Sequence, residues 1–483
     1  MRDLLVIGGG INGVGIANDA AGRGLSVVLL EQGDLAQATS SNSSKLIHGG
    51  LRYLEHYEFR LVHEALKERE VLLAKAGHIA WPLRFRLPHQ RGGRPNWLVR
   101  IGLFLYDHLG KRVSLPSTSR WSTDDARLHP HARKGFEYSD LWVDDARLVS
   151  LNAVQAAEQG ADIRTRTRFV SATPHDGGWR VVIEGPQGSE TLDVRAVVNA
   201  AGPWVDQVFG GIGAPSPHPA RLIKGSHIVV PKLYDEERAY ILPNDDGRVV
   251  FVLPWLDDFS LIGTTDVEIT GDPGAARCSD EERDYLLTAV GRFFANAPGA
   301  DDIVWSFAGV RPLMDDGDGN AQKVTRDYRL ILNTDRAPLL SVHGGKLTTY
   351  RTLAQKAVDK LAGVFPAMGP QWTATAPLPG AANLDVSAVQ STLEQRGFDS
   401  RTARRMTRAY GTLALAFTEG GTGAMGQHFG AGLYEDEVRY LMEHEWAISA
   451  DDVLYRRTKM GLFLTEEQRQ HLGHWMQAHP IAA

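Results

Sequence analysis

A single cysteine, Cys278, occurs in this chain of 483 residues. One thiol excludes an intrachain disulfide framework, a dithiol redox pair and any multi-cysteine metal or iron–sulfur site. We therefore expect that any redox chemistry depends on an organic cofactor, and we predict no metal site.

Excess positive charge and long apolar runs are missing as well. The formal net charge is −6, which argues against a nucleic-acid partner because phosphate neutralisation needs a basic face. No run approaches the roughly 18–20 apolar residues of a membrane span. The first residues, Met1-Arg2-Asp3, lead directly into an apolar segment without the pattern of a signal peptide. We expect a protein that stays inside the cell and lacks a transmembrane helix.

The composition is that of a globular enzyme, with 43% hydrophobic and 23% charged residues. The length favours two or three domains. Local patterns predict buried strands at 4–8 and 26–31 around a helix at 11–23, an antiparallel meander at 162–202, an antiparallel sheet at 221–310, a strand, Gly-Gly turn and helix at 340–363, a linker at 369–382 and a helical cap at 385–475. No internal repeat is visible.

A glycine motif, Gly8-x-Gly10-x-x-Gly13, joins the first strand to the first helix. The first glycine allows the tight turn, the second lets a pyrophosphate approach the backbone, and the third lets helix and sheet pack closely. The helix N-terminus then faces the phosphates. Glu31 ends the second strand at the spacing of a carboxylate that binds an adenosine ribose. These features predict a dinucleotide site, and the motif by itself does not separate NAD from FAD.

Further along the chain, several blocks of sequence are distinctive. They are residues 40–54 (SSNSSKLIHGGLRYL), 142–148 (WVDDARL), 221–227 (RLIKGSH), 262–266 (IGTTD), 309–312 (GVRP), 344–351 (GGKLTTYR), 444–446 (HEW) and 456–459 (RRTK). Together they resemble the FAD-dependent, quinone-reducing aerobic glycerol-3-phosphate dehydrogenases, and the likeness extends over nearly the whole chain.

The resemblance implies an activity and a set of partners. The expected reaction is oxidation of sn-glycerol 3-phosphate to dihydroxyacetone phosphate by hydride transfer to non-covalently held FAD, with electrons passing to ubiquinone. A peripheral homodimeric enzyme on an anionic lipid surface, at the cytoplasmic side of the bacterial inner membrane, is also implied. The mitochondrial relatives carry a targeting presequence and EF-hands, and because we see neither pattern in this sequence we expect a prokaryotic protein.

The resemblance also implies an α/β + α fold in three parts. We predict a Rossmann-like FAD-binding domain of the glutathione-reductase and amino-acid-oxidase type, an antiparallel-sheet substrate domain and a C-terminal helical domain. The predicted ranges are 1–75, 151–215 and 311–368 for the FAD-binding domain, 76–150 and 216–310 for the substrate-binding domain, 369–383 for the linker and 384–483 for the helical domain.

Hydroxyls and exposed backbone are the features expected around a flavin. Residues 40–44 provide the hydroxyls, Gly49 and Gly50 provide bare backbone, and Ala201-Gly202 ends a strand where ligands gather in open sheets. For His48 we favour a structural or flavin-lining role over direct chemistry. The predicted cofactor-binding residues are Gly8, Gly10, Ile11, Asn12, Gly13, Glu31, Ser40, Ser41, Ser43, Ser44, Lys45, His48, Gly49, Gly50, Leu51, Ala201, Gly202, Trp204, Gly345, Lys346, Leu347 and Thr348.

A phosphorylated substrate requires cations around a dianion, and arginine is preferred because its planar fork binds phosphate bidentately. By the resemblance, Arg52, Arg311 and Lys346 bind the substrate near the flavin. Tyr53 and Thr265 add hydrogen bonds.

Oxidation of a secondary alcohol also requires a base for the hydroxyl proton. We predict His227 as this base, because an unperturbed imidazole titrates near pH ~6.5. Arg311 and Lys346 complete the predicted catalytic set. If His227 is not the base, Arg311, Lys346 or a water molecule remains.

Three alternative functions stay open. A glycerophosphate oxidase would pass electrons to oxygen and release peroxide. An amine or amino-acid oxidase of the same superfamily would need a site for a carboxylate and a neutral amine, whereas this site is rich in cations. A non-catalytic flavoprotein that acts as a regulator or scaffold is disfavoured by the joint presence of Arg52, Arg311 and Lys346.

A local excess of positive charge lies at residues 81–112. The segment contains Arg84, Arg86, Arg91, Arg94, Arg100, Lys111 and Arg112, one acidic residue, Asp107, and the interleaved aromatics Trp81, Phe85, Trp97, Phe104 and Tyr106. Mixed basic and aromatic residues around the apolar stretch 98–106 are typical of a surface that lies on anionic lipid. A buried helix with basic flanks is the alternative, and the helix predicted at 348–361 is a second candidate for the lipid surface.

Overall fold

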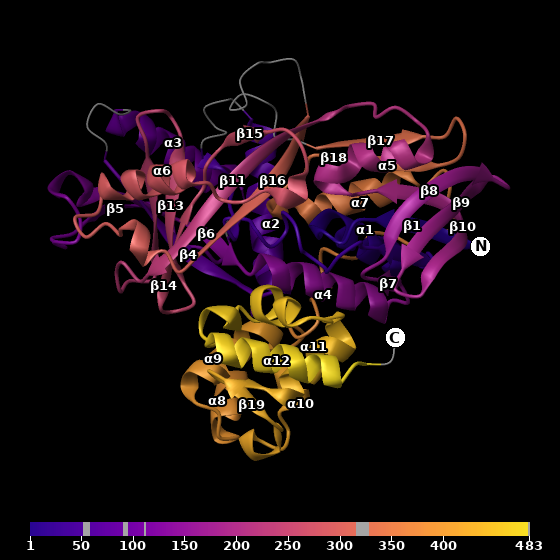
Figure 1. Cartoon of the computed structure of the whole chain (residues 1–483). Helices are drawn as coiled ribbons and strands as arrows, with labels where there is room; N and C mark the ends of the chain where they lie inside the picture. Colours follow the sequence, from indigo (N-terminus) through magenta and orange to yellow (C-terminus); the bar gives the residue numbers. More distant parts are fainter. Residues whose placement is uncertain (52–57, 90–94, 111–112, 315–327, 482–483) are drawn as a thin grey trace.

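The structure is a computed structural model that describes residues 1–51, 58–89, 95–110, 113–314 and 328–481. Two β-sheets lie side by side, and a smaller, mostly helical part built from the end of the chain packs beneath them (Figure 1). Helix α4 (Asp145–Glu158) lies between the first sheet and this C-terminal part. The contact between these parts includes an ion pair from Arg147 of α4 to Glu445.

The first sheet contains the N-terminal strand. In order across the sheet, the described strands are β17 (Arg329–Asn333), β18 (Leu339–His343), β10 (Gly188–Asn199), β1 (Arg2–Ile7), β2 (Val27–Leu30) and β7 (Asp162–Arg164). From β18 to β7 all neighbours are parallel. Strands β1 and β2 are apolar because both faces of a parallel sheet are covered.

The two faces of this sheet are covered differently. Helices α1 (Ile11–Gly22), α4 and α7 (Tyr350–Lys360) pack on one face. The other face packs on α5 (Val205–Ile212) and on the meander formed by β8 (Arg168–His175), β9 (Gly178–Gly185) and β10. The predicted βαβ unit and meander are confirmed.

The second sheet is mainly antiparallel, with one parallel pair between β4 and β12. The described strands in order are β15 (Val267–Ile269), β11 (Ala220–Pro231), β14 (Phe259–Gly263), β13 (Val249–Trp255), β12 (Arg238–Pro243), β4 (Ala80–Pro88), β6 (Lys134–Val143) and β3 (Leu46–Ile47), with β16 (Trp305–Met314) beside β11 and β5 (Ser119–Ser122) beside β6. Helices α2 (Phe59–Lys75) and α3 (Asn96–Leu109) cover one face, and α6 (Asp280–Gly291) covers the other.

The C-terminal part has its own apolar core. Its described elements are α8 (Val386–Gln395), α9 (Ser400–Tyr410), α10 (Ala414–Phe417), β19 (His428–Gly430), β20 (Leu433–Tyr434), α11 (Glu435–Glu445), a π-helical turn at Asp452–Arg457 and α12 (Glu466–Ala478). The small hairpin β19–β20 departs from the expected all-helical cap, because strands of two and three residues are too short to produce a visible alternation.

The predicted fold class, a Rossmann-like domain with an antiparallel-sheet domain and a C-terminal helical domain, is confirmed. Among the described residues, no helix is long and apolar enough to cross a membrane. The residue ranges assigned above to each domain stay a prediction.

Candidate active site

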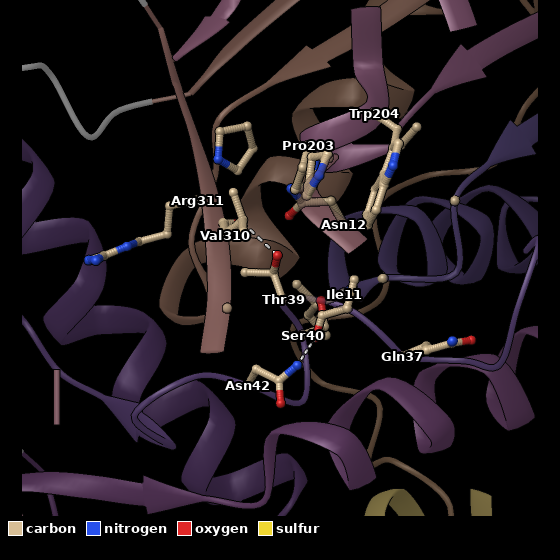
Figure 2. A pocket seen from close by; sticks show the side chains of 18 of the residues that line it. Ile11, Asn12, Gln37, Thr39, Ser40, Asn42, Pro203, Trp204, Val310 and Arg311 are labelled. Carbon is tan, nitrogen blue, oxygen red and sulfur yellow. Dashed lines mark hydrogen bonds between the residues drawn. The ribbon is translucent and has the colours of Figure 1, made fainter. Parts of the chain in front are cut away.

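A cavity of about 1000 Å³ lies between the two sheets. Residues at the carboxyl ends of β1, β2 and β10 line one side, and residues of β11 and β16 line the other. The hydroxyl of Thr39 donates a hydrogen bond to the carbonyl of Val310 at 2.6 Å, which joins the two walls (Figure 2). A cavity of this size is at the upper end of the range for ligand sites, so it suits a dinucleotide together with a small substrate.

The glycine motif forms the turn from β1 into α1. Gly10 caps α1, and the Ser40 hydroxyl accepts the Ile11 N–H at 3.0 Å. A β-carbon added to Gly13 would lie 1.8 Å from the carbonyl oxygen of Gly8, so only glycine permits this approach of helix and strand. The positive end of α1 therefore lies at the cavity, where it favours phosphate groups.

Asn12 and Glu31 add polar groups beside this turn. The two Glu31 carboxylate oxygens accept backbone N–H groups of Gly9 and Gly33, each at 2.8 Å, while burial raises the pKa of Glu31. Each oxygen retains a further lone pair, as a ribose hydroxyl requires. The side-chain oxygen of Asn12 is buried and has no hydrogen-bond partner within the described ranges. Both residues line the cavity and fit a bound dinucleotide.

The serine-rich loop before β3 is anchored to α4 by hydrogen bonds to Asp145, the first residue of that helix. The Asp145 carboxylate accepts the Ser43 hydroxyl at 2.7 Å and the Lys45 ammonium at 2.8 Å. Lys45 also donates to the carbonyl of Ser41. The ammonium of Lys45 is thus buried beneath the loop, and Ser43 and Ser44 line the cavity.

Arg311 projects from β16 on the opposite wall. One nitrogen of its guanidinium donates to Asp266 at 2.6 Å and to the carbonyl of Thr265 at 3.1 Å. Gly225 on the paired strand β11 lies against it: an added β-carbon would be 2.8 Å from that nitrogen and 2.5 Å from the Thr264 hydroxyl oxygen. These contacts fix the guanidinium before any substrate binds.

His227 lies on β11, opposite Gly263 and Phe307 of the flanking strands. Its ring stacks on Phe307 with centroids 4.9 Å apart, and its Nε2 is 2.9 Å from the Ser44 hydroxyl oxygen. Burial, with the cations of Lys45 and Arg311, lowers the pKa of His227 to about 3. The imidazole of the ligand-free protein is therefore neutral at physiological pH. The unperturbed imidazole pKa near 6.5 takes no account of this burial or of the two neighbouring cations, and the role of His227 as base stays a prediction.

Most of the predicted site residues line this one cavity. The predicted residues that do so are Gly8, Gly10, Ile11, Asn12, Glu31, Ser40, Ser43, Ser44, His48, Ala201, Gly202, Trp204, His227, Arg311, Gly345, Lys346, Leu347 and Thr348. Their roles toward cofactor and substrate stay predictions.

Other predicted residues do not line the cavity, namely Gly13, Ser41, Lys45, Gly49, Gly50, Leu51 and Thr265. Arg52 and Tyr53 lie outside the described residues. The N–H of Gly49 donates to the Tyr106 hydroxyl at 2.7 Å. The Thr265 hydroxyl donates to Glu282 at 2.6 Å and accepts the N–H of Ser226. Because the Thr265 hydroxyl is buried and already hydrogen-bonded, it stabilises the local fold. Its predicted hydrogen bond to substrate would require the side chain to break these bonds and turn toward the cavity.

Several lining residues were not predicted. They include Thr39, Asn42, Thr167, Phe169, Val170, Pro203, Gln207, Thr264, Arg277, Gly309 and Val310. Asn42, Thr264, Gly309 and Val310 lie inside the distinctive blocks, and Pro203 lies between the predicted Gly202 and Trp204, so the sequence did carry a signal for them. Phe169 and Val170 lie in β8, whose local sequence carries no ligand-binding pattern, so only the sheet topology reveals them.

Comparison with known proteins defines the class. Residues 3–351 match the family model described as FAD dependent oxidoreductase, and residues 371–478 match the C-terminal domain of alpha-glycerophosphate oxidase. The chain belongs to the FAD dependent oxidoreductase family, and the predicted FAD cofactor is confirmed.

Three relatives align with this chain over nearly the full length of both proteins. Glycerol-3-phosphate dehydrogenase of Pseudomonas aeruginosa is 55% identical, over 99% of this chain and 96% of the relative. Aerobic glycerol-3-phosphate dehydrogenase of Escherichia coli is 52% identical over 98% and 97%. D-erythritol 1-phosphate dehydrogenase of Brucella abortus is also 52% identical, over 100% and 99%. The predicted resemblance to the glycerol-3-phosphate dehydrogenases is confirmed.

A solved structure supports the same fold. Glycerol-3-phosphate dehydrogenase from Bacillus halodurans, complexed with FAD, superposes with a TM-score of 0.75 at 27% identity and covers 99% of this chain and 94% of its own. L-alpha-glycerophosphate oxidase from Mycoplasma pneumoniae, with a TM-score of 0.63, 20% identity and coverage of 78% and 99%, shares the fold.

Proposed function

We propose that this protein oxidises the secondary hydroxyl of sn-glycerol 3-phosphate and releases dihydroxyacetone phosphate. The observation that carries the proposal is the placement of two cations, Arg311 and Lys346, in the same cavity as the neutral imidazole of His227. FAD, when bound, supplies the two-electron acceptor for the hydride. Full-length relatives named for this activity support the assignment.

Arg311 and Lys346 would bind the phosphate dianion. Arg311 is already oriented by Asp266 and by the Thr265 carbonyl, so little conformational freedom is lost when the phosphate binds. The predicted Arg52 would add a third cation, and Tyr53 keeps its predicted role as a hydrogen-bonding residue. Thr265 would act indirectly, because its carbonyl accepts the Arg311 guanidinium while its hydroxyl is bonded to Glu282.

His227 would accept the hydroxyl proton as the hydride leaves the same carbon. Its low pKa in the ligand-free protein comes from burial and from Lys45 and Arg311. A bound dianion would offset these positive charges and raise the pKa of the imidazole, because opposite charges stabilise the protonated ring. The base would thus become stronger when the substrate is in place.

Gly225→Ala is expected to raise KM for glycerol 3-phosphate by about tenfold and to change kcat less. The added methyl would lie 2.8 Å from the Arg311 nitrogen, so the guanidinium must move from its prepared position, at a cost of about 1–2 kcal/mol. Steady-state kinetics of the FAD-loaded variant measures this. Gly210→Ala, with no heavy atom within 4 Å of the added carbon, is the control, and an unchanged KM in Gly225→Ala would contradict the role of Arg311.

Substrate choice is tested by comparing glycerol 3-phosphate, D-erythritol 1-phosphate and glycerol at equal concentrations. We expect glycerol 3-phosphate to give the highest kcat/KM, and glycerol, which has no phosphate for the two cations, to give a value at least 10³-fold lower. A higher kcat/KM for D-erythritol 1-phosphate would replace the proposed substrate with that of the Brucella abortus relative.

We also propose ubiquinone as the electron acceptor, in line with the family resemblance. Turnover under nitrogen with a soluble ubiquinone analogue is expected to be at least tenfold faster than turnover with oxygen. Stoichiometric hydrogen peroxide without added quinone would instead identify a glycerol-3-phosphate oxidase.

Helix α3 supports the proposed contact with anionic lipid. Its outer face exposes apolar side chains, with Trp97 64% exposed, Phe104 59%, Ile101 48%, Leu98 44% and Leu105 37%. Arg100 on the same helix is exposed as well. Apolar groups flanked by cations suit insertion at a lipid headgroup boundary.

The rest of segment 81–112 is placed differently. Phe85 and Tyr106 are buried, and Arg84 and Arg86 pair with Glu137. The predicted Arg91, Arg94, Lys111 and Arg112 lie outside the described residues. The proposed lipid surface therefore comprises the exposed face of α3.

Phe104→Asp is expected to weaken binding to liposomes containing anionic lipid by about tenfold. The change removes an exposed ring from the proposed contact and adds a charge that anionic lipid repels. Cosedimentation measures it, and Val304→Asp, at another exposed apolar side chain that is 50% accessible, is the matched control. Equal binding by both variants would exclude this face of α3.

We also propose that the protein forms a homodimer and lies peripherally at the cytoplasmic side of the bacterial inner membrane. The domain ranges given from the sequence are proposals as well. Size-exclusion chromatography with light scattering would measure the oligomeric state.

A further inference from the structure

The loop after β2 carries the residues that line the end of the cavity where an adenosine is expected. Glu31, Gln32, Gly33, Ala36 and Gln37 all line it. The loop is tied to the glycine turn, since the Ala36 N–H donates to the carbonyl of Gly9 at 3.1 Å. Its conformation therefore decides the shape of this end of the cofactor site.

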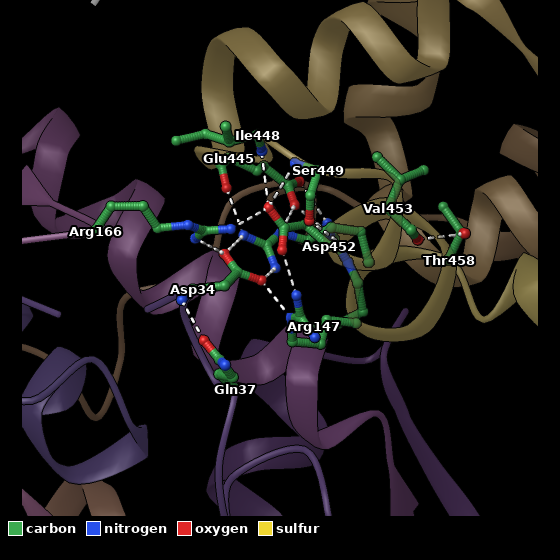
Figure 3. Close-up of polar contacts among 12 residues, drawn as sticks. Asp34, Gln37, Arg147, Arg166, Glu445, Ile448, Ser449, Asp452, Val453 and Thr458 are labelled. Atoms are coloured by element: carbon green, nitrogen blue, oxygen red, sulfur yellow. Dashed lines mark hydrogen bonds and ion pairs between the residues drawn. The ribbon is translucent and has the colours of Figure 1, made fainter. Parts of the chain in front are cut away.

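Asp34, in the middle of this loop, is directed away from the cavity into the C-terminal domain (Figure 3). Its side chain is completely buried. Both carboxylate oxygens accept the fork of Arg457 at 2.8 Å each, and Arg456 donates to one of them. Arg166 adds an ion pair at 3.3 Å. Two of the three cations that neutralise Asp34 thus come from residues more than 400 positions away in sequence.

A second buried carboxylate, Asp452 of the C-terminal domain, shares Arg456 and Arg166 with Asp34, so that these residues form one ion-pair network. It accepts Arg456, Arg166 and the N–H groups of Ile448 and Ser449 (Figure 3). Burial acts to raise the pKa of Asp452, but these amides and guanidinium groups outweigh it and lower the pKa. Asp452 begins the π-helical turn that ends at Arg457, and such turns often occur at functional sites.

Arg166 connects the network back to the cofactor loop. Its N–H donates to the carbonyl of Gly33 at 2.9 Å, and the next residue, Thr167, lines the cavity and donates its N–H to the carbonyl of Glu31. The backbone on both sides of the adenosine end is therefore held by residues that are themselves bonded to the C-terminal domain.

The burial of the Asp34 carboxylate explains why its arginine partners would affect cofactor binding. A buried carboxylate is tolerated only while its partners are present, and removal of one partner leaves an uncompensated charge. Without Arg456 and Arg457, Asp34 would retain Arg166 alone and would gain by moving toward water. That movement would displace Gly33, which precedes Asp34, and Gln37, whose side-chain carbonyl accepts the Asp34 N–H at 2.8 Å.

We propose that the C-terminal domain is a positioning device for the cofactor: Arg456 and Arg457 fix Asp34, and thereby hold the adenosine end of the FAD site in its binding conformation. The proposal requires only that the chain binds FAD and is independent of the substrate proposed above.

The test uses Arg457→Met in the full-length protein, stripped of FAD and titrated separately with FAD and with ADP, which probes the adenosine end alone. Quenching of flavin fluorescence gives the Kd for FAD, and calorimetry gives the Kd for ADP. We expect both to rise at least tenfold and by similar factors. Arg457→Lys, which keeps the charge but lacks the fork, should recover part of the loss.

The matched control is Arg405→Met, which removes a similar pair with buried Glu437 inside the C-terminal domain. We expect it to lower the unfolding temperature of the apoprotein while Kd for FAD and ADP stays within twofold of wild type. If Arg457→Met does not fold, Arg456→Gln, at a side chain that is 15% exposed, should raise both Kd values at least threefold. Unchanged Kd values, a change for FAD but not ADP, or equal effects in the control would each overturn the proposal.

Discussion

Replacement of Arg311 by methionine is expected to lower kcat/KM for glycerol 3-phosphate by about 10³-fold. Methionine keeps much of the volume but removes a cation from the cavity wall that is proposed to hold the phosphate. Loss of a charge-assisted bidentate interaction with the phosphate is expected to cost about 4 kcal/mol, which corresponds to this factor. The change also leaves Asp266 without the guanidinium that it now contacts at 2.6 Å.

The measurement is steady-state kinetics on protein with a verified FAD content. Arg311→Lys should lose about thirtyfold, because lysine keeps the charge without the planar fork. Arg221→Met is the matched control: Arg221 is on the neighbouring strand β11, pairs with Glu268 and does not line the cavity, so kcat/KM should change less than threefold. A reduction below tenfold in Arg311→Met would remove Arg311 from the proposed substrate site.

The second large effect concerns His227. His227→Asn is expected to lower kcat by 10²- to 10³-fold, within the usual contribution of a general base. Asparagine can keep a hydrogen bond to Ser44 but cannot accept a proton at neutral pH. His129→Asn, at a half-buried histidine bonded to the carbonyl of Gly291, should change kcat less than threefold.

The pH dependence of kcat/KM tests the protonation state of His227. Its pKa in the free protein is lowered to about 3, so the imidazole stays neutral from pH 5 to pH 9 and gains no proton as the pH falls through 6.5. A decline of kcat/KM near pH 6 is then expected from the substrate phosphate, whose second ionisation lies near ~6. That decline should persist in His227→Asn. Its disappearance would mean that His227 titrates there and carries a charge that this account excludes.

Local sequence was sufficient for the cofactor turn. Gly8, Gly10 and Gly13 act within one strand–turn–helix unit, and Glu31 is reached by the next strand, so spacing alone fixes their relation. The grouping of the proposed substrate-binding residues could not be predicted from local spacing. Arg311 and His227 are brought together by the pairing of β11 with β16, and only the resemblance to a known family grouped them in advance.

Side-chain direction was the main limit of the sequence-based predictions. Lys45 lies in the predicted cofactor loop, yet its ammonium is buried against Asp145, a hundred residues further along the chain. Thr265 falls beside the predicted substrate residues, yet its hydroxyl bonds Glu282. Neither orientation is encoded in the local pattern, because each depends on a partner from another element.

Contacts of the C-terminal domain with the rest of the protein could not be predicted from local sequence either. Its helices follow from periodicity, and the block 456–459 was distinctive in the sequence. The partner of Arg457, however, is Asp34, 423 residues away. A charged pair at that separation has no local signature, so the proposed link between this domain and the cofactor could be inferred only from the fold.

FAD and glycerol 3-phosphate are proposed to bind side by side in this one cavity. Anaerobic addition of glycerol 3-phosphate to the FAD-loaded protein tests this most directly, with flavin absorbance as the readout and glycerol as the control. We expect the oxidised flavin band to bleach fully with glycerol 3-phosphate and to remain with glycerol, while one dihydroxyacetone phosphate forms per flavin. A band that persists after addition of glycerol 3-phosphate would contradict the account.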